Sequence, residues 1–339
     1  MNNSFKGKLG PLLIAEIGGN HEGNFDYALK LTKQAISTGA DFIKFQLYTG
    51  DTLVSRIESP KRNKHFKTFE LSKEQNIYLA KTINEAGLNY MASVWDEDMI
   101  EWIDPYMSIY KVGSGDLTAY PVLRSIAKKG KPIILSTGLS TEKEVLDAVD
   151  FIQSVDEKYK SPNFLALLQC TSMYPISDSD ANLAVISELK KQTGLTVGYS
   201  DHTIGLKALI YAYALGAEIL EFHFTDSREG KQFRDHKVSL TPSEVQMLQE
   251  EIKLINIYKG NKEKKPLPIE IDNGHDVSFR RAVYPVKDLP AGTVINEKDL
   301  ICLRPNVGID AREYDKLIGK KTKIDLKAHQ KLEWNYLTD

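Results

Sequence analysis

Short apolar runs rich in β-branched residues alternate with longer amphipathic stretches from residue 12 to about residue 258. Such alternation is typical of β/α units built around a parallel sheet. The eight strand candidates are residues 12–18, 41–47, 89–95, 109–114, 132–137, 164–170, 196–202 and 218–224, each followed by helical periodicity. Eight units in roughly 250 residues predict a (β/α)8 TIM barrel of the α/β class.

Each strand candidate begins with apolar residues and ends with polar or small ones. In a TIM barrel the strand interiors pack the core, whereas the C-terminal strand ends carry the functional residues. We therefore expect the site at that rim. The segments SKEQ at 72–75, STEKE at 140–144 and TPSE at 241–244 have the form of helix N-caps.

A change of composition follows the last barrel helix. The stretch 259–278 is rich in Lys, Pro, Gly and Asn and lacks helical periodicity, which is typical of a linker. The residues after it show short β-like runs, a DLPAGT turn and a polar helix-like segment at 310–317, but they are few for a robust core. We expect a barrel domain at 1–260, a linker at 261–278 and a small domain at 279–339 that docks on its own barrel or a partner's.

The composition is ordinary for a soluble globular protein, with 42% apolar and 27% charged residues among 339. A formal net charge of −2 argues against the broad basic face of a nucleic-acid binder. The start MNNSFKGKLG lacks the apolar stretch of a signal peptide, and no apolar run approaches the ~20 residues of a membrane span. We expect a cytoplasmic protein with no membrane association. Cys170 and Cys302 are interpreted as small core residues.

Two histidines lie at the ends of neighbouring strand candidates, His202 after Ser200-Asp201 and His223 after Glu221-Phe222. A lone histidine is usually a hydrogen-bonded structural residue. A pair at a barrel rim favours a metal site, because imidazole is the commonest ligand of divalent transition metals. Two imidazoles with carboxylates and open positions suit Mn²⁺, Fe²⁺, Co²⁺ or Zn²⁺ acting as a Lewis acid on a carbonyl.

Lysines occupy the middle of two hydrophobic strand candidates, at Lys44 and Lys111. A buried ammonium is costly unless it meets a carboxylate or an anion, so each lysine belongs either to a salt bridge, for example with Glu16, or to an anion site. Ser114 and Ser136 lie at strand-to-helix turns, where hydroxyl and backbone N–H groups can bind a phosphate. Lysines and serines together favour the anion site.

Taken in order, these segments resemble the signatures of the sialic acid synthase family, which comprises N-acetylneuraminate, legionaminate and pseudaminate synthases. The matching segments are IAEIGGNHEG (14–23), DFIKFQLY (41–48), YKVGSGD (110–116), PIILSTG (132–138), QCTSMYP (169–175), GYSDHT (198–203) and EFHFTD (221–226). In the tail, RRAVYPVKDLPAG and LRPNVGI resemble that family's antifreeze-like C-terminal domain, a SAF fold of the β-clip type. The resemblance spans nearly the whole chain.

The resemblance implies a nonulosonic (sialic-type) acid synthase that condenses phosphoenolpyruvate with an N-acylated mannosamine-type sugar and water and releases phosphate. It makes His202 and His223 the ligands of a divalent metal, Mn²⁺ first, with Mg²⁺ or Co²⁺ as alternatives. The residues expected around phosphoenolpyruvate are Lys44, Lys111, Ser93, Ser114 and Ser136, and those expected to meet the sugar, the water or the reacting centre are Glu16, Gln46, Tyr174, Glu221 and Asp235. The resemblance also implies a domain-swapped homodimer, in which Arg304 of each small domain covers the other subunit's substrate.

In the implied reaction the metal polarises the open-chain aldehyde, and C3 of phosphoenolpyruvate attacks it, which leaves an oxocarbenium-like centre at C2. Water, deprotonated with the help of the metal or of a carboxylate such as Glu221, adds at C2, and phosphate leaves. The expected catalytic residues are Glu16, Lys44, Lys111 and Glu221. The alternatives are a related synthase of 3-deoxy-keto-sugar phosphates, which would lack the small domain, and a non-catalytic carbohydrate- or ice-binding protein, which would need no metal beside an anion site.

Three segments depart from the family pattern. The segment ASVWD at 92–96 stands where relatives more often carry STPFD, and EGKQFRDHKVSL at 229–240 is longer than the usual segment, with His236 as the alternative to Asp235. In RPNVGI, Asn306 stands where a glycine commonly follows the proline. The basic run KRNKH at 61–65 is interpreted as a solvated loop rather than a site for an anionic sugar.

Overall fold

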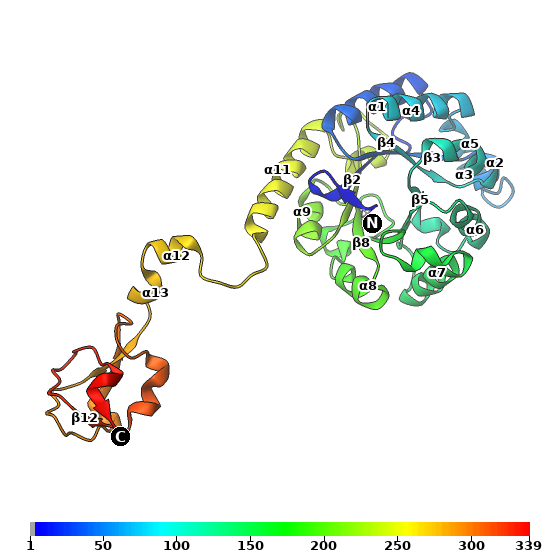
Figure 1. Ribbon diagram of the computed structural model, residues 1–339. Helices are drawn as coiled ribbons and strands as arrows, with labels where there is room; N and C mark the ends of the chain where they lie inside the picture. Colours follow the sequence, from blue (N-terminus) through cyan, green and yellow to red (C-terminus); the bar gives the residue numbers. More distant parts are fainter. Residues whose placement is uncertain (1–3) are drawn as a thin grey trace. The chain divides into compact units, whose positions relative to one another are not determined.

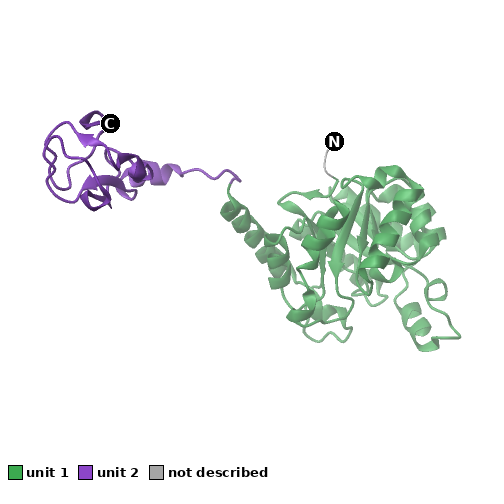
Figure 2. Ribbon diagram, turned by 90° about the horizontal axis from the view of Figure 1, so that it is seen from below, with its two compact units in different colours: residues 1–260 green, residues 261–339 purple. Residues whose placement is uncertain are grey.

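The computed structural model describes residues 4–339, which fall into two compact units that divide after Gly260 (Figure 2). The first unit is the larger one and ends at Gly260, and the second covers Asn261–Asp339. Within the described part of the chain, no helix is both long and apolar enough to cross a membrane. Each unit has its own buried apolar cluster.

The first unit is a closed barrel of eight parallel strands, β2 to β9, in which each strand pairs with the next and β9 pairs back with β2. The strands are β1 (Lys6–Gly7), β2 (Gly10–Glu16), β3 (Phe42–Leu47), β4 (Asn89–Val94), β5 (Tyr110–Val112), β6 (Ile133–Ser136), β7 (Leu165–Cys170), β8 (Thr196–Asp201) and β9 (Ile219–His223). The short β1 pairs antiparallel with β2. All eight predicted strands are present, so the predicted TIM barrel is confirmed.

Helices surround the strands on the outside of the barrel (Figure 1). They are α1 (Phe25–Thr38), α2 (Gly50–Leu53), α3 (Pro60–Thr68), α4 (Lys73–Glu85), α5 (Glu97–Ile103), α6 (Tyr120–Lys128), α7 (Glu142–Val155), α8 (Val185–Thr193), α9 (Lys207–Ala214), α10 (Asp235–Val238) and α11 (Pro242–Lys259). Short 3-10 helices are η1 (Asp104–Tyr106), η2 (Ser114–Asp116), η3 (Glu157–Lys160) and η4 (Asp178–Ala181). The three predicted N-caps are present as capping boxes at Ser72, Thr141 and Thr241.

The barrel interior is apolar at one level and polar at the next. The apolar cluster consists of Phe5, Leu12, Ile14, Phe42, Met91, Ile109, Ile134, Ala166, Leu168 and Ile219. Along a strand, the next residue on the same face lies two positions further on. Every barrel strand except β8 contributes to this cluster, β5 through the residue just before it, and two positions beyond the last apolar residue of each contributing strand come Glu16, Lys44, Ser93, Lys111, Ser136, Cys170 and Glu221, all buried. The alternation therefore places a polar layer directly on an apolar core, at the C-terminal rim.

The segment between β3 and α4 is helical where the sequence suggested a loop. Residues 61–65 belong to α3, which begins with Pro60 at its first position. The buried side chain of Asn63 fastens α3 to the preceding turn by donating to the carbonyl oxygens of Gly50 and Val54, both at 2.8 Å. The prediction of a loop was wrong, because a short and highly polar helix shows little hydrophobic periodicity. The run is nevertheless solvated as expected, since all of its residues except Asn63 are exposed.

The second unit contains α12 (Pro268–Asp272), α13 (His275–Ser278), β10 (Ala282–Pro285), β11 (Leu300–Leu303), β12 (Lys321–Thr322) and β13 (Leu337–Thr338), with 3-10 helices η5 (Glu297–Asp299), η6 (Ala311–Leu317) and η7 (Trp334–Tyr336). Strands pair in two antiparallel ribbons, β10 with β11 and β12 with β13. The buried core is made of Val283, Leu289, Ile295, Leu300, Ile309, Leu317, Leu326, Leu332 and Leu337. The segment expected to be an irregular linker therefore includes two short helices, α12 and α13.

Candidate active site

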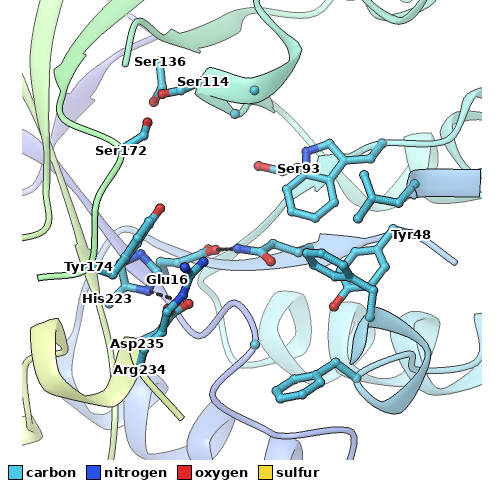
Figure 3. A pocket seen from close by; sticks show the side chains of 18 of the residues that line it. Glu16, Tyr48, Ser93, Ser114, Ser136, Ser172, Tyr174, His223, Arg234 and Asp235 are labelled. Atoms are coloured by element: carbon cyan, nitrogen blue, oxygen red, sulfur yellow. Dashed lines mark hydrogen bonds and ion pairs between the residues drawn. The ribbon is translucent and has the colours of Figure 1, made fainter. Parts of the chain in front are cut away.

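A cavity of about 1170 Å³ opens at the C-terminal rim of the barrel. Every predicted site residue of the first unit lines it: Glu16, Lys44, Gln46, Ser93, Lys111, Ser114, Ser136, Tyr174, His202, Glu221, His223 and Asp235. Apart from Asp235, which begins α10, they come from the eight barrel strands or from the segments that directly follow those strands. The close view in Figure 3 shows Ser114, Ser136 and Ser172 on one side of this cavity and Tyr48 on another.

Four charged side chains form the floor of the cavity, and we call Glu16, Lys44, Lys111 and Glu221 the charged layer. Lys44 Nζ lies 2.8 Å from Glu16 Oε2 and 3.0 Å from Glu221 Oε1. Lys111 Nζ lies 3.4 Å from Glu221 Oε2 and donates to Ser136 Oγ at 2.7 Å. All four are buried, and two positive charges face two negative ones. The salt bridge considered for Lys44 with Glu16 is therefore present inside the cavity itself.

The two carboxylates of the charged layer have different proton affinities. Burial raises the pKa of Glu16 above its usual value, against the attraction of Lys44. Burial would also raise the pKa of Glu221, but attraction to Lys111 and Lys44 outweighs it and holds that pKa at about 2. For Lys111, burial lowers the pKa. Environments that push the pKa values of neighbouring carboxylates apart are typical of sites that move protons.

Three hydroxyls and one glycine form what we call the serine cradle: Ser114, Ser136, Ser172 and Gly138. The backbone N–H of Gly138 donates to Ser114 Oγ at 3.0 Å. A Cβ atom at residue 138 would overlap Ser172 Oγ and come within 2.9 Å of Ser114 Oγ, so only glycine leaves the cradle open. Figure 3 shows the three hydroxyls close together. Clustered hydroxyl and N–H donors beside the ammonium of Lys111 are suited to an anion such as phosphate.

The two predicted metal ligands lie side by side, with the ring centroids of His202 and His223 separated by 5.3 Å. Their strands β8 and β9 approach closely, because Gly198 leaves room for the backbone of Ile219 that a Cβ would overlap. His202 Nδ1 lies 2.7 Å from the carbonyl oxygen of Thr171. Since a carbonyl only accepts, that nitrogen carries the hydrogen, and Nε2 keeps a free lone pair.

His223 Nδ1 is buried and has no hydrogen-bond partner among residues 4–339; the nearest carboxylate oxygen, Asp235 Oδ2, is 3.9 Å away. Burial lowers the pKa of both His202 and His223, so both imidazoles are neutral, as metal ligation requires. The described residues include no group of three or more His, Cys, Asp or Glu side chains placed to hold a metal. A divalent cation held by these two neutral imidazoles would therefore need water or substrate oxygens as its remaining ligands.

Tyr174 and Asp235 stand next to the histidine pair. The Tyr174 ring lies 4.0 Å from that of His202 and 5.5 Å from that of His223, measured between centroids. Arg234 lies over the Tyr174 ring at 4.8 Å, and its Nε is 3.3 Å from Asp235 Oδ1. Asp235 lines the cavity, whereas His236 does not and instead lies 2.7 Å from Thr225 Oγ1. Of the two alternatives at this position, Asp235 is the one in the site.

Aromatic rings cover the opposite side of the cavity, and we call Tyr48, Phe66, Phe69, Trp95 and Phe233 the aromatic wall. Trp95 and Tyr48 stack at 5.1 Å, and Tyr48 meets Phe66 edge to face at 5.2 Å. Phe69 and Phe233 are 4.8 Å apart between centroids. The side chains of Arg62 and His65 line the same region from α3. Sequence reasoning missed the five aromatic residues, because single aromatics at strand ends and in short polar helices look like ordinary core or surface positions. It considered the run that contains Arg62 and His65 but did not assign that run to the site.

Two further residues remain, one that the sequence analysis missed and one whose predicted role is untested. Ser172 was missed as a site residue, although its place after β7 in QCTSMYP is the same strand-end signal that nominated the other serines. Arg304 belongs to the second unit, where it is exposed and lies 5.4 Å over the Phe279 ring. Its predicted role toward another subunit stays a prediction.

Comparisons with known proteins agree with this architecture. Residues 31–264 match the NeuB family and residues 280–338 match the SAF domain, which confirms the predicted small domain. The N,N'-diacetyllegionaminic acid synthase of Legionella pneumophila is 34% identical over 342 residues, covering 96% of this chain and 94% of that protein. The N-acetylneuraminate-9-phosphate synthase of Homo sapiens is 33% identical, covering 92% and 88%. A crystal structure of N-acetylneuraminic acid synthetase from Leptospira borgpetersenii in complex with citrate superposes with a TM-score of 0.71 at 30% identity, covering 78% of this chain and 90% of that one.

Proposed function

Because the chain belongs to the NeuB family, we propose that it is a nonulosonic acid synthase, a transferase that condenses phosphoenolpyruvate with an N-acylated mannosamine-type sugar and water and releases phosphate. The observation that carries the proposal is the meeting of the charged layer, the serine cradle and the histidine pair in one cavity. The names of the relatives support a sialic-type product, since they are synthases of legionaminic acid and of N-acetylneuraminate 9-phosphate.

In this proposal the serine cradle binds the phosphate of phosphoenolpyruvate. Ser114, Ser136 and Ser172 donate from their hydroxyls, and Lys111, which already donates to Ser136, supplies the positive charge. Lys44 and Ser93, whose Nζ and Oγ atoms are 3.4 Å apart, face the carboxylate. Lys44, Ser93, Lys111 and Ser136 lie on strands, and Ser114 and Ser172 lie in the segments that follow β5 and β7. Donors held by the barrel in this way need little reorganisation when substrate binds.

Carbon–carbon bond formation joins C3 of phosphoenolpyruvate to the aldehyde carbon of the sugar. A divalent metal held by His202 and His223, which we propose to be Mn²⁺, would supply Lewis acidity to the aldehyde oxygen. The charged layer alone is neutral, so it holds an anion well only when further positive charge is near. Tyr174 and Asp235 lie beside the histidine pair, where they orient the sugar.

The bond leaves C2 of the former enolpyruvate electron-poor, and water adds there. Its proton passes to a carboxylate of the charged layer, Glu16 or Glu221. Gln46 Nε2 donates to Glu16 Oε1 at 2.8 Å and Lys44 lies on the other oxygen, so the Glu16 carboxylate has a fixed orientation. The C2–O bond to phosphate then breaks while the C2 hydroxyl loses its proton and becomes the ketone, and inorganic phosphate leaves with the electron pair. The alkoxide formed from the aldehyde takes up a proton, so the reaction balances.

We further propose that the enzyme works as a domain-swapped homodimer in the cytoplasm. Both cysteines are free, which suits a reducing compartment. Arg304 is exposed on the second unit and so is free to approach a second subunit. Mixing Arg304→Ala subunits with Lys44→Ala subunits should restore activity in the mixed dimer. One of its two sites then combines an unaltered barrel from one subunit with an unaltered Arg304 from the other. Failure of rescue after confirmed subunit exchange would contradict the swap.

Release of inorganic phosphate from phosphoenolpyruvate tests the proposed reaction. With Mn²⁺ present, release should require an N-acylated amino-sugar and stop on chelation. The His202→Ala and His223→Ala variants should stay folded and inactive. Release with an aldose phosphate that lacks an N-acyl group would indicate a keto-sugar phosphate synthase instead. Absence of release with every sugar would favour a carbohydrate-binding protein.

A further inference from the structure

Between β9 and α11 the chain leaves the barrel as a closed loop, residues 225–239. Backbone hydrogen bonds join the two ends of this loop. The N–H of Thr225 donates to the carbonyl oxygen of Leu240 at 3.0 Å, and the N–H of Leu240 donates to that of His223 at 2.7 Å. The loop brings Asp235 back beside the histidine pair (Figure 3). Its ends are therefore fixed, and the position of Asp235 depends on what holds the rest of the loop.

The carboxylate of Asp235 does little to fix its own position. In the described part of the chain its one hydrogen-bond partner is Arg234, an exposed neighbour on the same loop, at 3.3 Å. His223 Nδ1 lies 3.9 Å away, which is too far for a hydrogen bond. The buried carboxylate thus has no hydrogen bond to any other element of the barrel among residues 4–339. Its place beside the histidine pair must come from the backbone around it.

The residue after Asp235 is held from two sides. The ring of His236 is buried, with Nδ1 2.7 Å from Thr225 Oγ1 and Nε2 3.2 Å from Glu22 Oε1. A carboxylate only accepts, so Nε2 carries the hydrogen of the bond to Glu22. The ring therefore connects α10, which begins at Asp235, both to the start of its own loop and to the turn that follows β2.

Glu22 has an unusual backbone conformation for its residue type. Its φ is +51°, in the left-handed region that glycine adopts freely and that costs other residues free energy. Its side chain has one hydrogen-bond partner within residues 4–339, which is His236. Backbone conformations of this kind persist where the surrounding contacts impose them, and they are frequent at functional sites. A glutamate at this position is therefore expected to matter for what its side chain holds.

A second chain of hydrogen bonds runs from the same turn to the backbone of Asp235. Asn20 is fully buried and donates from Nδ2 to Ser239 Oγ at 2.8 Å. Ser239 Oγ in turn donates to the carbonyl oxygen of Asp235 at 2.7 Å. One turn after β2 thus holds Asp235 on both sides, through Ser239 at its carbonyl group and through His236 at the next residue.

We propose that Glu22 and His236 are a pair of positioning residues, which hold Asp235 toward the histidine pair so that its carboxylate orients the sugar. The inference rests on the proposed function, in which Asp235 acts on the sugar. His236 does not line the cavity, so it acts only through the loop. Glu22 does line the cavity, so its action through His236 must be separated from a direct contact with the sugar. A displacement of about 1 Å in such a group can cost about 10²-fold in rate.

A double-mutant cycle separates the two possibilities, with phosphate release measured from phosphoenolpyruvate, Mn²⁺ and N-acetylmannosamine. Glu22→Ala and His236→Ala should each lower kcat/KM for the sugar by at least about 10-fold and leave the KM for phosphoenolpyruvate unchanged. The double variant should be no more than about 2-fold worse than either single variant, because both substitutions remove the same contact. Additive losses would overturn the inference, since Glu22 would then act on the sugar directly.

Two further variants distinguish positioning from stability of the loop. Glu22→Gln keeps an acceptor oxygen for His236 Nε2, so kcat/KM for the sugar should stay within about 3-fold of wild type. Tyr27→Phe is the matched control, because the Tyr27 hydroxyl donates to Asp226 Oδ1 and accepts from Lys231 Nζ, both at 2.6 Å, on the same loop but away from Asp235. It should leave kcat/KM nearly unchanged. Equal losses in Tyr27→Phe and His236→Ala would overturn the inference, because loop stability alone would explain them.

Amide hydrogen exchange tests the pair without any substrate. The backbone N–H groups of residues 236 and 237 donate to the carbonyl oxygens of Phe233 and Arg234 at 3.2 and 3.1 Å. They should exchange at least about 10-fold faster in Glu22→Ala and in His236→Ala than in wild type or Tyr27→Phe. Because Glu22 is exposed, its variant provides this test even if His236→Ala does not fold.

The exchange experiment also separates two kinds of failure. Faster exchange in both variants of a protein that releases no phosphate with any N-acylated amino-sugar would contradict the proposed function and leave the positioning of the loop standing. Unchanged exchange in an active protein would overturn the inference and leave the proposed function intact.

Discussion

The charged layer and the aromatic wall line the same cavity but are built from different parts of the fold. Glu16, Lys44, Lys111 and Glu221 stand on strands, are buried and hold one another by ion pairs. The wall comes from segments beyond the strand ends, where it touches solvent and its members meet only through ring contacts. Changes in the layer should therefore affect folding and chemistry together, whereas changes in the wall should affect only the binding of the sugar.

The largest effect is expected at Lys44, which bridges both carboxylates of the layer. Lys44→Met removes the ammonium and leaves Glu16 and Glu221 facing each other in a buried site. We expect a loss of about 3–5 kcal/mol in the free energy of unfolding, because one partner of a buried ion pair is missing. Phosphate release should fall at least about 10³-fold. Denaturant titration and steady-state kinetics measure the two losses.

A double variant separates folding from chemistry at the same place. Lys44→Met with Glu16→Gln removes one positive and one negative charge, so Glu221 keeps Lys111 as its partner. The double variant should regain more than half of the lost stability and none of the lost activity. Recovery of both stability and activity would show that Lys44 acts only through the fold. Recovery of neither would show that restoring the charge balance does not offset the loss of Lys44.

The next effect is expected at the histidine pair, which lies between the two regions. Mn²⁺ should raise the melting temperature of the wild-type protein. At a Mn²⁺ concentration about 100 times its dissociation constant, the free energy of unfolding should rise by up to about 3 kcal/mol. His202→Ala should abolish that shift and lower phosphate release by about 10²- to 10³-fold. Calorimetry with and without Mn²⁺ provides the readout. An equal Mn²⁺ shift in the variant would mean that the cation binds elsewhere.

A smaller, pH-dependent effect is expected at Asp116, a cavity carboxylate outside the charged layer. Burial raises its pKa to about 6, whereas an unfolded Asp titrates near pH 4, at about 3.9. The folded protein thus binds the proton more tightly, and the resulting stabilisation is fully present below pH 4 and lost as pH rises through 6. Asp116→Asn cannot ionise, so above pH 7 it should be more stable than wild type by about 1–2 kcal/mol.

The difference in free energy of unfolding between wild type and Asp116→Asn, measured from pH 4 to pH 8, reports on Asp116 alone because the two proteins share every other titrating group. Parallel stability curves would show that this carboxylate ionises as freely in the fold as in the unfolded chain. A gap that widens between pH 4 and pH 6 would show that charge outside the ion-paired layer is poorly compensated.

The smallest effect is expected in the wall itself. Phe69→Leu should raise the KM for the sugar by about 5- to 10-fold, because the smaller side chain loses part of its contact with the sugar. The KM for phosphoenolpyruvate should not change, because the serine cradle is untouched. Stability should change by less than about 1.5 kcal/mol. Phe164→Leu, whose ring packs against Tyr159 outside the cavity, is the matched control. A parallel rise in both KM values would remove the distinction between the two regions.

The charged layer could be predicted from the sequence because strand geometry is regular. A lysine in the middle of a hydrophobic strand must point into the barrel or out to a helix, and in either case it needs a partner. The family resemblance, carried by Glu16, Lys44 and Glu221, then selected the inward position. Even so, the sequence left open whether Lys44 meets an anion or a carboxylate, since cross-strand partners depend on register, which only the structure supplies.

The aromatic wall could not be predicted in the same way. Arg62 and His65 belong to a nine-residue helix with little hydrophobic periodicity, so nothing in its pattern indicates which side faces the cavity. Trp95 was visible only as a departure from the family pattern, and its unpaired N–H is a property of packing. Contacts among loops arise from tertiary structure, which local sequence patterns do not encode.

At Gly138, a single methyl group would be enough to close the serine cradle. The hydroxyls of Ser114 and Ser172 lie beside this residue, and a single added methyl group would either enter the proposed phosphate position or turn the Ser172 hydroxyl aside. Alanine at residue 138 would preserve each charge and each donor elsewhere in the molecule. If the proposed function holds, this variant would be a steric knockout that still binds sugar and metal but has no space for phosphoenolpyruvate.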